Sequence, residues 1–452
     1  MYQFLIIAIR NVAKNKTRSL MLGGAIAAVT ALMVVLMSLT SGIHSTIFET
    51  ATALATGHLN IGGYYKLSQS SAAPVVTKYK PVEEIVRKHV PEATLVINRI
   101  RCFGKLISDT TSIMVPMFGV DMKTEQETIG RLAMAEKNEY IENYAYKDGE
   151  NKTEGNLAEL NSQRSIVLFA SHAKKLKVKV GDTLTVSMPT YRNISNTKDV
   201  KIAAILRDVG MMSSFTVFIN HNDARDLYQL APDSTGVVMI FLKSTSTMKR
   251  IEERLRTILS EKKYELMEKD SQPFWMKFDR ISGESWTGQK LDVTTWEDET
   301  SFIKWILDIF YTITFIMTAV LMTIIVIGLV NNLWISIRER TSEIGTLRAI
   351  GTQRRQVTLM FVLEASVLSI TATAIGISAG VLISVFLDAL QITLPQGALR
   401  MFLMSNNLNL KVNFGAITIC FLVITVFLTL GSVFPARRAG KVKPITAINQ
   451  VE

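Results

Sequence analysis

The chain has 452 residues, of which 48% are hydrophobic and 20% charged, and its formal net charge is +11. This composition is too apolar for a disordered chain, and its two cysteines are too few for a disulfide-stapled secreted domain. Four long stretches carry almost no charge, which excludes a purely soluble protein. Because the basic residues cluster beside these stretches, the positive net charge does not indicate a nucleic-acid partner.

The four apolar stretches predict membrane-spanning helices. They are Ser19–Thr40, Ile309–Ile337, Ala365–Leu387 and Val412–Ala436. About 20 apolar residues suffice for a helix to cross the hydrocarbon core of a bilayer. We therefore expect transmembrane helices at 19–42, 303–335, 357–387 and 412–436.

Basic residues mark the cytoplasmic side of these helices. They stand before the first helix (Arg10, Lys14, Lys16, Arg18), between the second and third (Arg338, Arg340, Arg348, Arg354, Arg355) and after the fourth (Arg437, Arg438, Lys441, Lys443). The loop between the third and fourth helices has only Arg400 and Lys411. Segments 1–18, 336–356 and 437–452 are thus predicted to be cytoplasmic, and segments 43–300 and 388–411 to lie outside. Segment 1–18 reads as an interfacial amphipathic helix or as a plain anchor.

The outer segment 43–300 is predicted to fold as a mixed α/β domain with two lobes. Short β-branched or alternating runs indicate strands at 58–61, 94–107, 112–120, 165–169, 182–188, 200–206, 216–220 and 237–242. Helical patterns occur at 81–89, 170–176, 222–230 and 248–268. The polar stretch 131–164 suggests a surface excursion or a link between lobes.

Two further parts of the outer segment leave alternatives open. The stretch 184–205 reads as two strands whose polar tip, with Tyr191, Arg192 and Asn193, is either a turn without a role or a docking element for a carrier protein. The aromatic residues of 271–305 suit an interfacial belt near the second helix, a lobe core or a contact with an apolar substrate.

Motifs of catalysis are absent from the sequence. It contains no GxSxG, HExxH or CxxC motif, and its five histidines show no metal-ligand spacing. No GxxxxGK[ST] phosphate loop occurs, so we expect no enzymatic activity and no ATP hydrolysis by this chain alone.

The loop after the second helix is the most informative segment. It reads SIRERTSEIGTLRAIGTQRRQVTLMFVLEASV, with Ile337, Ile344 and Leu347 at helical intervals. A short amphipathic helix at the membrane surface suits docking of a soluble partner, although a solvated connector has the same composition.

This loop resembles the corresponding segment of FtsX/MacB/LolCE-type permeases of ABC transporters. The family pattern, roughly R-x-K/R-E-I-G-x-L-R-A-x-G followed by R-R and E, is matched here by Arg338, Arg340, Glu343, Ile344, Gly345, Leu347, Arg348, Ala349, Gly351, Arg354, Arg355 and Glu364. Ser342 stands where the family has a basic residue. AIRNVAKNKTRS before the first helix, GHLNI after it and PARRAGKVKPITAI near the C-terminus are also similar to family motifs. The resemblance covers all four helices and both ends, and the outer domain only loosely.

The resemblance implies partners and a fold. The loop would be a coupling helix that seats in a separate cytoplasmic ATPase dimer through Arg340, Glu343, Ile344, Gly345, Leu347, Arg348, Ala349 and Gly351. ATP and magnesium would bind that ATPase, and this chain would hold no cofactor and no metal. A second permease, identical or paralogous, would complete the complex, and the outer domain would be of the Porter-plus-Sabre type.

The resemblance also implies a function. The nearest type is the LolC/LolE permease of the bacterial inner membrane, which drives extraction of lipoproteins from the bilayer and their transfer to a periplasmic carrier. A MacB-like export permease and an FtsX-like regulator of an extracytoplasmic enzyme are the alternatives. Force would travel along the stalks Ser41–Thr56 and Gly283–Thr300.

Two groups of residues within the bilayer are candidates for a role. An acyl cavity would be lined by Leu32, Val35, Leu36, Ile313, Ile316 and Met317, which would otherwise face lipid or pack between helices. Glu364 is an intramembrane carboxylate and so a functional candidate, or it forms a structural pair with Arg354, Arg355 or another basic residue.

Overall fold

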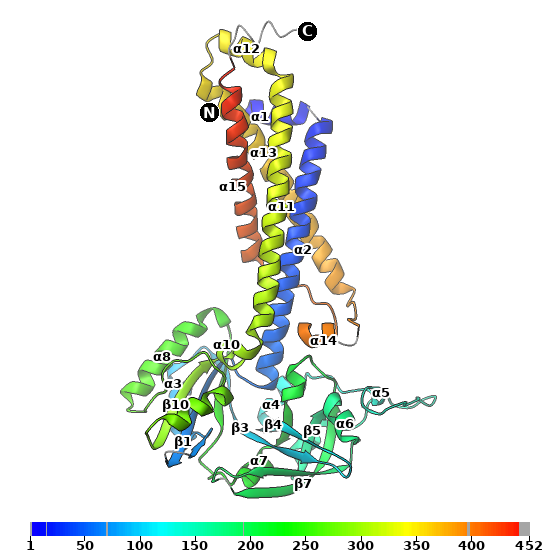
Figure 1. Ribbon diagram of the computed structural model, residues 1–452, viewed down its shortest axis with the longest axis vertical. Coiled ribbons are helices and arrows are strands. Elements are labelled where there is room, and N and C mark those ends of the chain that lie inside the picture. The colour runs from blue at the N-terminus through cyan, green and yellow to red at the C-terminus, as the bar shows by residue number, and fades with distance from the viewer. Residues whose placement is uncertain (1, 15, 69–70, 193, 396–397, 443–452) are drawn as a thin grey trace. The chain divides into compact units, whose positions relative to one another are not determined.

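The computed structural model describes residues 2–14, 16–68, 71–192, 194–395 and 398–442. The chain divides into two compact units, which are described separately (Figure 1). The membrane unit comprises Met1–Ser45, Leu307–Thr393 and Asn407–Glu452, and the outer unit comprises Thr46–Ile306 and Leu394–Asn406. The segment Leu394–Asn406, expected as part of a separate loop, thus belongs to the outer unit.

The membrane unit is helical. Its elements are α1 (Tyr2–Lys14), α2 (Lys16–Leu54), α11 (Lys304–Glu339), α12 (Thr341–Ala349), α13 (Arg354–Ala389) and α15 (Phe414–Ala439), except that α2 from Thr46 and α11 up to Ile306 belong to the outer unit. Four of these, α2, α11, α13 and α15, are long and apolar enough to cross a membrane, at the places that the sequence predicts. The helix α12 joins α11 to α13 (Figure 1).

Small residues bring α2 and α13 into close contact. A methyl group built on Gly376 would lie 2.5 Å from the carbonyl oxygen of Ala27, and one built on Gly380 would lie 2.8 Å from that of Ala31. Without a hydrophobic driving force between helices in lipid, such close backbone approach supplies the packing energy. A hydroxyl pair adds a polar contact, since the Oγ1 atoms of Thr40 on α2 and Thr314 on α11 are 2.7 Å apart.

The length of α15 indicates which part of α2 lies within the bilayer. Asn413 caps α15 by accepting hydrogen bonds from the backbone of Gly415 and Ala416, and Arg437 stands near the other end. Just before that cap, Lys411 donates its backbone N–H to the carbonyl of Ser38 at 3.0 Å and its Nζ to Ser45 Oγ at 2.7 Å. The outer end of α15 is therefore level with Ser38–Ser45, and α2 continues beyond it to Leu54.

The outer unit is built around a ten-stranded sheet. The strands are β1 (Leu59–Ser68), β2 (Ser71–Ala73), β3 (Ala93–Ile107), β4 (Ser112–Val120), β5 (Ser165–Phe169), β6 (Thr183–Pro189), β7 (Ser195–Leu206), β8 (Val217–Asn220), β9 (Val237–Leu242) and β10 (Gly288–Thr295). The helices are α3 (Tyr79–His89), α4 (Met122–Ile129), α5 (Lys137–Tyr140), α6 (Ala170–Leu176), α7 (His221–Tyr228), α8 (Met248–Glu261), α9 (Phe278–Gly283), α10 (Trp296–Glu299) and α14 (Ala398–Leu403).

The long strand β3 is shared by two lobes. In the first lobe the strand order is β10-β1-β9-β3, and residues 93–99 of β3 pair with β9. In the second lobe, residues 100–107 of β3 pair with β4, and the order continues β4-β8-β5-β7-β6. Because β6 pairs with β3 as well, this second run of strands closes on itself as a barrel.

Apolar side chains fill the barrel. One fully buried residue from each strand shows the pattern: Leu106, Met117, Ile166, Val186, Ile202 and Ile219. The alternating runs predicted from the sequence are these strands, and the expected mixed α/β domain with two lobes is present.

The outer unit differs from the expectations in several details. The strand β10 occupies a stretch expected as a stalk, 283–300, which also contains the short helix α10. The short strand β2 was not expected. The helix α8 ends at Glu261, before the predicted residue 268, and Lys263 there has a positive φ of 62°.

Candidate coupling site

The helix α12 forms a short, sharply bounded element at the cytoplasmic end of the membrane unit. One residue, Arg340, separates it from α11. Two residues after its end at Ala349 comes Gly351, whose φ of +109° favours glycine. The backbone N–H of Thr352 donates to the carbonyl of Leu347 at 3.0 Å, which satisfies one of the free carbonyls at the helix end.

One face of α12 is buried in the chain itself. Ile344 is 1% exposed and packs in a cluster from α11, α13 and α15 that contains Ile337, Val357, Phe361, Ala436 and Ala439. Gly345 is buried as well. Ile344 and Gly345, both expected among the ATPase-coupling residues, therefore lie away from solvent and hold α12 against the longer helices.

A second side of α12 is exposed and carries both apolar and polar residues. Leu347 is 39% exposed and Ile350 is 80% exposed, while Glu343, Ala349 and Gly351 are also exposed. Ile350 was not among the residues expected there. The sequence feature that could have identified Ile350 is its position directly before Gly351, the glycine that follows the helix.

Glu364 is paired with a basic residue, and the partner is Arg340. The Arg340 Nη1 atom lies 3.1 Å from Glu364 Oε2, and both side chains are about 15% exposed (14% and 15%). Glu343 approaches the same arginine only to 4.0 Å and is 73% exposed. The carboxylate therefore ties α13 to the start of α12, as a structural pair would. Arg354 and Arg355, the partners named from the sequence, are exposed.

Two arginines complete the region. Arg348 is partly buried, and its Nε has no hydrogen-bond partner among the described residues. The Arg438 guanidinium at the end of α15 lies over the rings of Trp334 (5.3 Å) and Phe434 (4.7 Å), which joins α15 to α11. The C-terminal family motif continues into residues 443–448, which lie outside the described residues.

The residues expected to line an acyl cavity lie on open faces of α2 and α11. Leu32, Ile313, Ile316 and Met317 are 46%, 51%, 52% and 40% exposed, and Val35 and Leu36 are partly buried. These faces are available to lipid or to another membrane helix.

The tip of the predicted hairpin lies between β6 and β7. The backbone N–H of Tyr191 donates to the carbonyl of Tyr228 at 3.2 Å, and Arg192 Nε donates to the Tyr191 hydroxyl at 2.8 Å. The adjacent Ile194 is 60% exposed. Asn193 lies outside the described residues.

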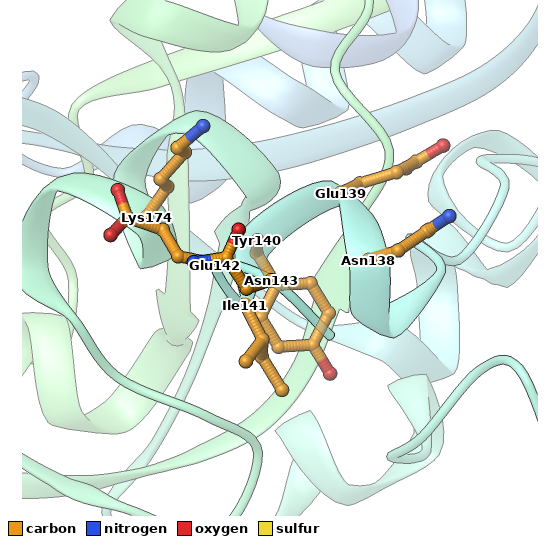
Figure 2. Close-up of a pocket in the computed structure, with 7 residues that line it drawn as sticks. All are labelled: Asn138, Glu139, Tyr140, Ile141, Glu142, Asn143 and Lys174. Carbon is orange, nitrogen blue, oxygen red and sulfur yellow. The ribbon is translucent and has the colours of Figure 1, made fainter. Parts of the chain in front are cut away.

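A polar pocket of about 360 Å³ lies in the outer unit, beside α5. Figure 2 shows Asn138 and Glu139 directed to one side and Lys174, from α6, to the other, with the ring of Tyr140 between them. Burial raises the pKa of the Tyr140 hydroxyl to about 12, so the group stays protonated. Within the part of the chain that the structure describes, no group of three potential metal ligands gathers, here or elsewhere.

Two family models match the chain. The model "MacB-like periplasmic core domain" matches residues 20–258, more than half of the chain, and "FtsX-like permease C-terminal" matches 315–444. The second match contains α12 and Glu364, so the residues of the coupling site lie within a permease domain.

Individual proteins give shorter or weaker matches. The macrolide export ATP-binding/permease protein MacB of Bradyrhizobium diazoefficiens is 31% identical over 144 residues, which are 31% of this chain and 20% of that protein. An uncharacterized ABC transporter permease of Methanocaldococcus jannaschii is 21% identical over 308 residues, 67% of each chain. The crystal structure of the periplasmic region of MacB from Actinobacillus actinomycetemcomitans aligns with 57% of this chain and 97% of its own, at 12% identity and a TM-score of 0.30.

The matched stretch is only about a fifth of the MacB protein from Bradyrhizobium diazoefficiens. The family models, in contrast, account for both the outer domain and the last membrane helices. The chain is a multi-pass membrane protein with an extracytoplasmic domain, and it belongs to the FtsX-like permeases of ABC transporters that carry a MacB-like periplasmic core domain.

Proposed function

We propose that this chain is the permease of a bacterial inner-membrane ABC transporter and that a separate cytoplasmic ATPase dimer drives it by docking on α12. The observation that carries the proposal is the division of α12 into two faces. Ile344 is buried against α11, α13 and α15, while Leu347 and Ile350, at successive three-residue intervals after it, stay exposed and form an apolar strip. An apolar helix face at a membrane surface suits a groove in a soluble partner.

A push on this strip would reach three membrane helices together. The chain leads directly from α12 into α11 and α13, and the cluster around Ile344 adds the end of α15. The Arg340–Glu364 pair and the stacked Arg438 resist sliding between these helices. Because packed helices move as bodies rather than deform continuously, the stroke would be passed along α11 toward the outer unit, to which α11 contributes its first residues.

Two cargoes fit such a machine. The first is a lipoprotein, extracted from the bilayer and passed to a periplasmic carrier at the β6–β7 tip. Each buried CH₂ of an acyl chain is worth about 0.8 kcal/mol, so two or three chains hold the anchor by on the order of tens of kcal/mol. The open apolar faces with Leu32 and Ile313 support this cargo, because a second permease copy or paralogue could enclose an acyl cavity against them.

The second cargo is a solute or peptide exported by a mechanotransmitting permease. Two observations favour it: the match to a protein named as a macrolide export ATP-binding/permease protein, and the match of the MacB-like periplasmic core domain model to residues 20–258. Mass spectrometry of proteins and lipids that co-purify with the complex separates the two: a bound lipoprotein supports the first cargo, and a periplasmic adaptor supports the second.

The docking proposal is tested with Leu347→Glu and Ile350→Glu in the full-length chain. Each places a charge on the apolar strip without touching the buried face, so we expect co-purification of the ATPase to fall by roughly tenfold or more, the usual cost of a charge at an apolar hot spot. Ile194→Glu is the matched control, since Ile194 is similarly exposed but lies in the outer unit. Normal ATPase recovery with both α12 variants would refute docking at this surface.

A further inference from the structure

The C-terminal end of α2 is held by a buried arginine from the outer unit's sheet. The last carbonyl groups of a helix have no partner within the helix. Here Arg99 of β3 donates from Nη1 to the carbonyl of Leu54 at 2.7 Å and from Nη2 to the carbonyl of Ala53 at 3.0 Å. The guanidinium also places positive charge at the negative end of the helix dipole.

The arginine is itself fixed by a buried carboxylate. Arg99 Nε and Nη2 lie 2.7 Å and 2.5 Å from Oε2 of Glu125, and both side chains are fully buried. Glu125 stands in the first turn of α4, where Asp121 caps the helix by accepting the backbone N–H of Lys123 at 3.0 Å. The chain of contacts thus runs from α2 through Arg99 to α4.

The turn that follows α2 allows little independent movement. The backbone N–H of Gly57 donates to Asn60 Oδ1 at 2.8 Å, and Asn60 Nδ2 donates to Thr56 Oγ1 at 2.7 Å. A methyl group on Gly57 would lie 2.9 Å from the backbone nitrogen of Ile240, so the turn is pressed against β9. The GHLNI motif, Gly57–Ile61, therefore forms a tight connection between the end of α2 and the strand β1.

Arg99 also stands where the two lobes meet. It is the last residue of β3 that pairs with β9, opposite Val237, and the next residue, Ile100, is the first that pairs with β4. Its own carbonyl accepts a hydrogen bond from the backbone N–H of Gly236 at 3.1 Å. A force applied to Arg99 would therefore reach the first lobe and the barrel at once.

A purely structural ion pair would not need this arrangement. Burying an arginine and a glutamate costs desolvation energy, and apolar residues of similar volume often stabilise a core as well or better. An apolar pair could not form hydrogen bonds to the end of α2 and to α4 at the same time. The Arg99 guanidinium donates to the carbonyls of Ala53 and Leu54 at the end of α2 and also to the Glu125 carboxylate of α4.

We propose that Arg99, held by Glu125, is a positioning residue that makes the end of α2 within the outer unit, Thr46–Leu54, and both lobes of that unit move as one body during the transport cycle. The proposal rests on the proposed function, since it needs a nucleotide-driven movement of the membrane helices. It names the buried groups through which the end of α2 would act on the sheet, namely the carbonyls of Ala53 and Leu54, the Arg99 guanidinium and the Glu125 carboxylate.

Amide hydrogen exchange on the full complex tests it, comparing the ATP-and-vanadate state with the nucleotide-free state. In the native protein we expect nucleotide-dependent changes at α12 and in the outer unit. In Arg99→Met the change at α12 should persist, while the change in the outer unit should shrink several-fold. The amides around Leu54 should exchange roughly tenfold or more faster, because charge-assisted hydrogen bonds at the helix end are lost.

Lys277→Met is the matched control. Lys277 and Asp292 form another buried pair in the outer unit, 2.7 Å apart, and within the described residues this pair makes no hydrogen bond or ion pair with α2. This variant should keep the nucleotide response at both sites. Glu125→Gln, which leaves Arg99 and its carbonyl bonds in place, should give an intermediate response and serves as the informative variant if Arg99→Met does not fold.

The outcomes separate the two proposals. A native protein without any nucleotide-dependent change at α12 contradicts the proposed function. If the native response at α12 and in the outer unit is unchanged in both Arg99→Met and Glu125→Gln, the proposed role of Arg99 is contradicted. Equal loss in Lys277→Met would also overturn it, because any buried pair would then matter as much.

Discussion

Buried charges organise the outer unit, and sequence patterns do not reveal them. Lys277 is fully buried against Asp292, and Lys66 is buried with its Nζ donating to the carbonyls of Ile281 and Glu284 at 2.8 Å and 2.7 Å. Lysine is almost never fully buried unless it is paired, so a sequence reading places it on the surface. The Arg99–Glu125 pair escaped prediction for the same reason, although its two members are separated by only one strand and one turn.

The imidazole of His58 gives a prediction at this scale. Its ring lies 5.0 Å from that of Phe48 and 5.5 Å from that of Phe241, and Nδ1 accepts the backbone N–H of Leu242 at 2.9 Å. Burial lowers the pKa of His58, and a ring nitrogen that accepts a hydrogen bond also favours the neutral form.

The sign of the pH dependence follows from this lowered pKa. Below the unfolded-state pKa of about 6.5, the unfolded chain binds a proton before the folded chain does, so stability falls as the pH drops through this value toward the folded pKa. We expect His58→Gln, which keeps an acceptor for Leu242, to lose less thermal stability between about pH 7.5 and about pH 5 than the native chain. Identical shifts of the unfolding midpoint would show that His58 does not titrate on unfolding. The pKa values of His172 and His221 are also lowered, mainly by burial, and both residues are present in both proteins.

At the scale of elements, some strands could be predicted at their observed bounds and others were missed. The strands β4, β5 and β9 were predicted at their observed bounds because their apolar residues alternate or run together between turns. The strand β10, GQKLDVTT, was missed although Leu291 and Val293 alternate with polar residues, and its polar Asp292 and Thr294 are buried as well as its apolar residues. The alternation therefore identifies the strand, but it does not show that the polar side of the strand is buried.

The contact between α2 and α13 gives a prediction at this scale. Alanine at Gly376 would put its methyl group 2.5 Å from Ala27 O and 2.9 Å from Ala27 Cα, so the helices must separate. We expect Gly376→Ala to lower the free energy of unfolding by about 1–3 kcal/mol, as overpacking usually does. Gly328 on α11 is the control, because a methyl group there meets nothing within 4 Å, and helix propensity would favour alanine by up to about 1 kcal/mol. Unfolding in detergent measures both, and equal effects would show that close approach of α13 to α2 is not what stabilises the bundle.

At the scale of the whole molecule, the sequence predicts the division into membrane and outer parts. It does not predict that the segment Leu394–Asn406 belongs to the outer unit. Four uncharged stretches mark the helices directly, because each side chain in lipid must be apolar. The segment Leu394–Asn406 joins the outer unit through contacts such as Gly210 against Met404, where a methyl on the glycine would lie 2.5 Å from Met404 Cα. Such a contact between residues almost two hundred positions apart has no local signature.

The orientation of the chain is a prediction about the whole molecule. The Lys and Arg residues beside α2, α12 and α15 are costly to translocate in short loops, whereas the large outer unit crosses regardless of its charge. Single cysteines at Ser246, exposed in the outer unit, and at Lys441, exposed after α15, report the two sides. We expect a membrane-impermeant maleimide to label Ser246→Cys in intact spheroplasts and Lys441→Cys only after permeabilisation. The native Cys102 and Cys420 are buried and should react slowly in both states, which the unsubstituted chain checks. Labelling of Lys441→Cys in intact spheroplasts would show that the predicted orientation is wrong. The helix α12 could then not bind a cytoplasmic ATPase.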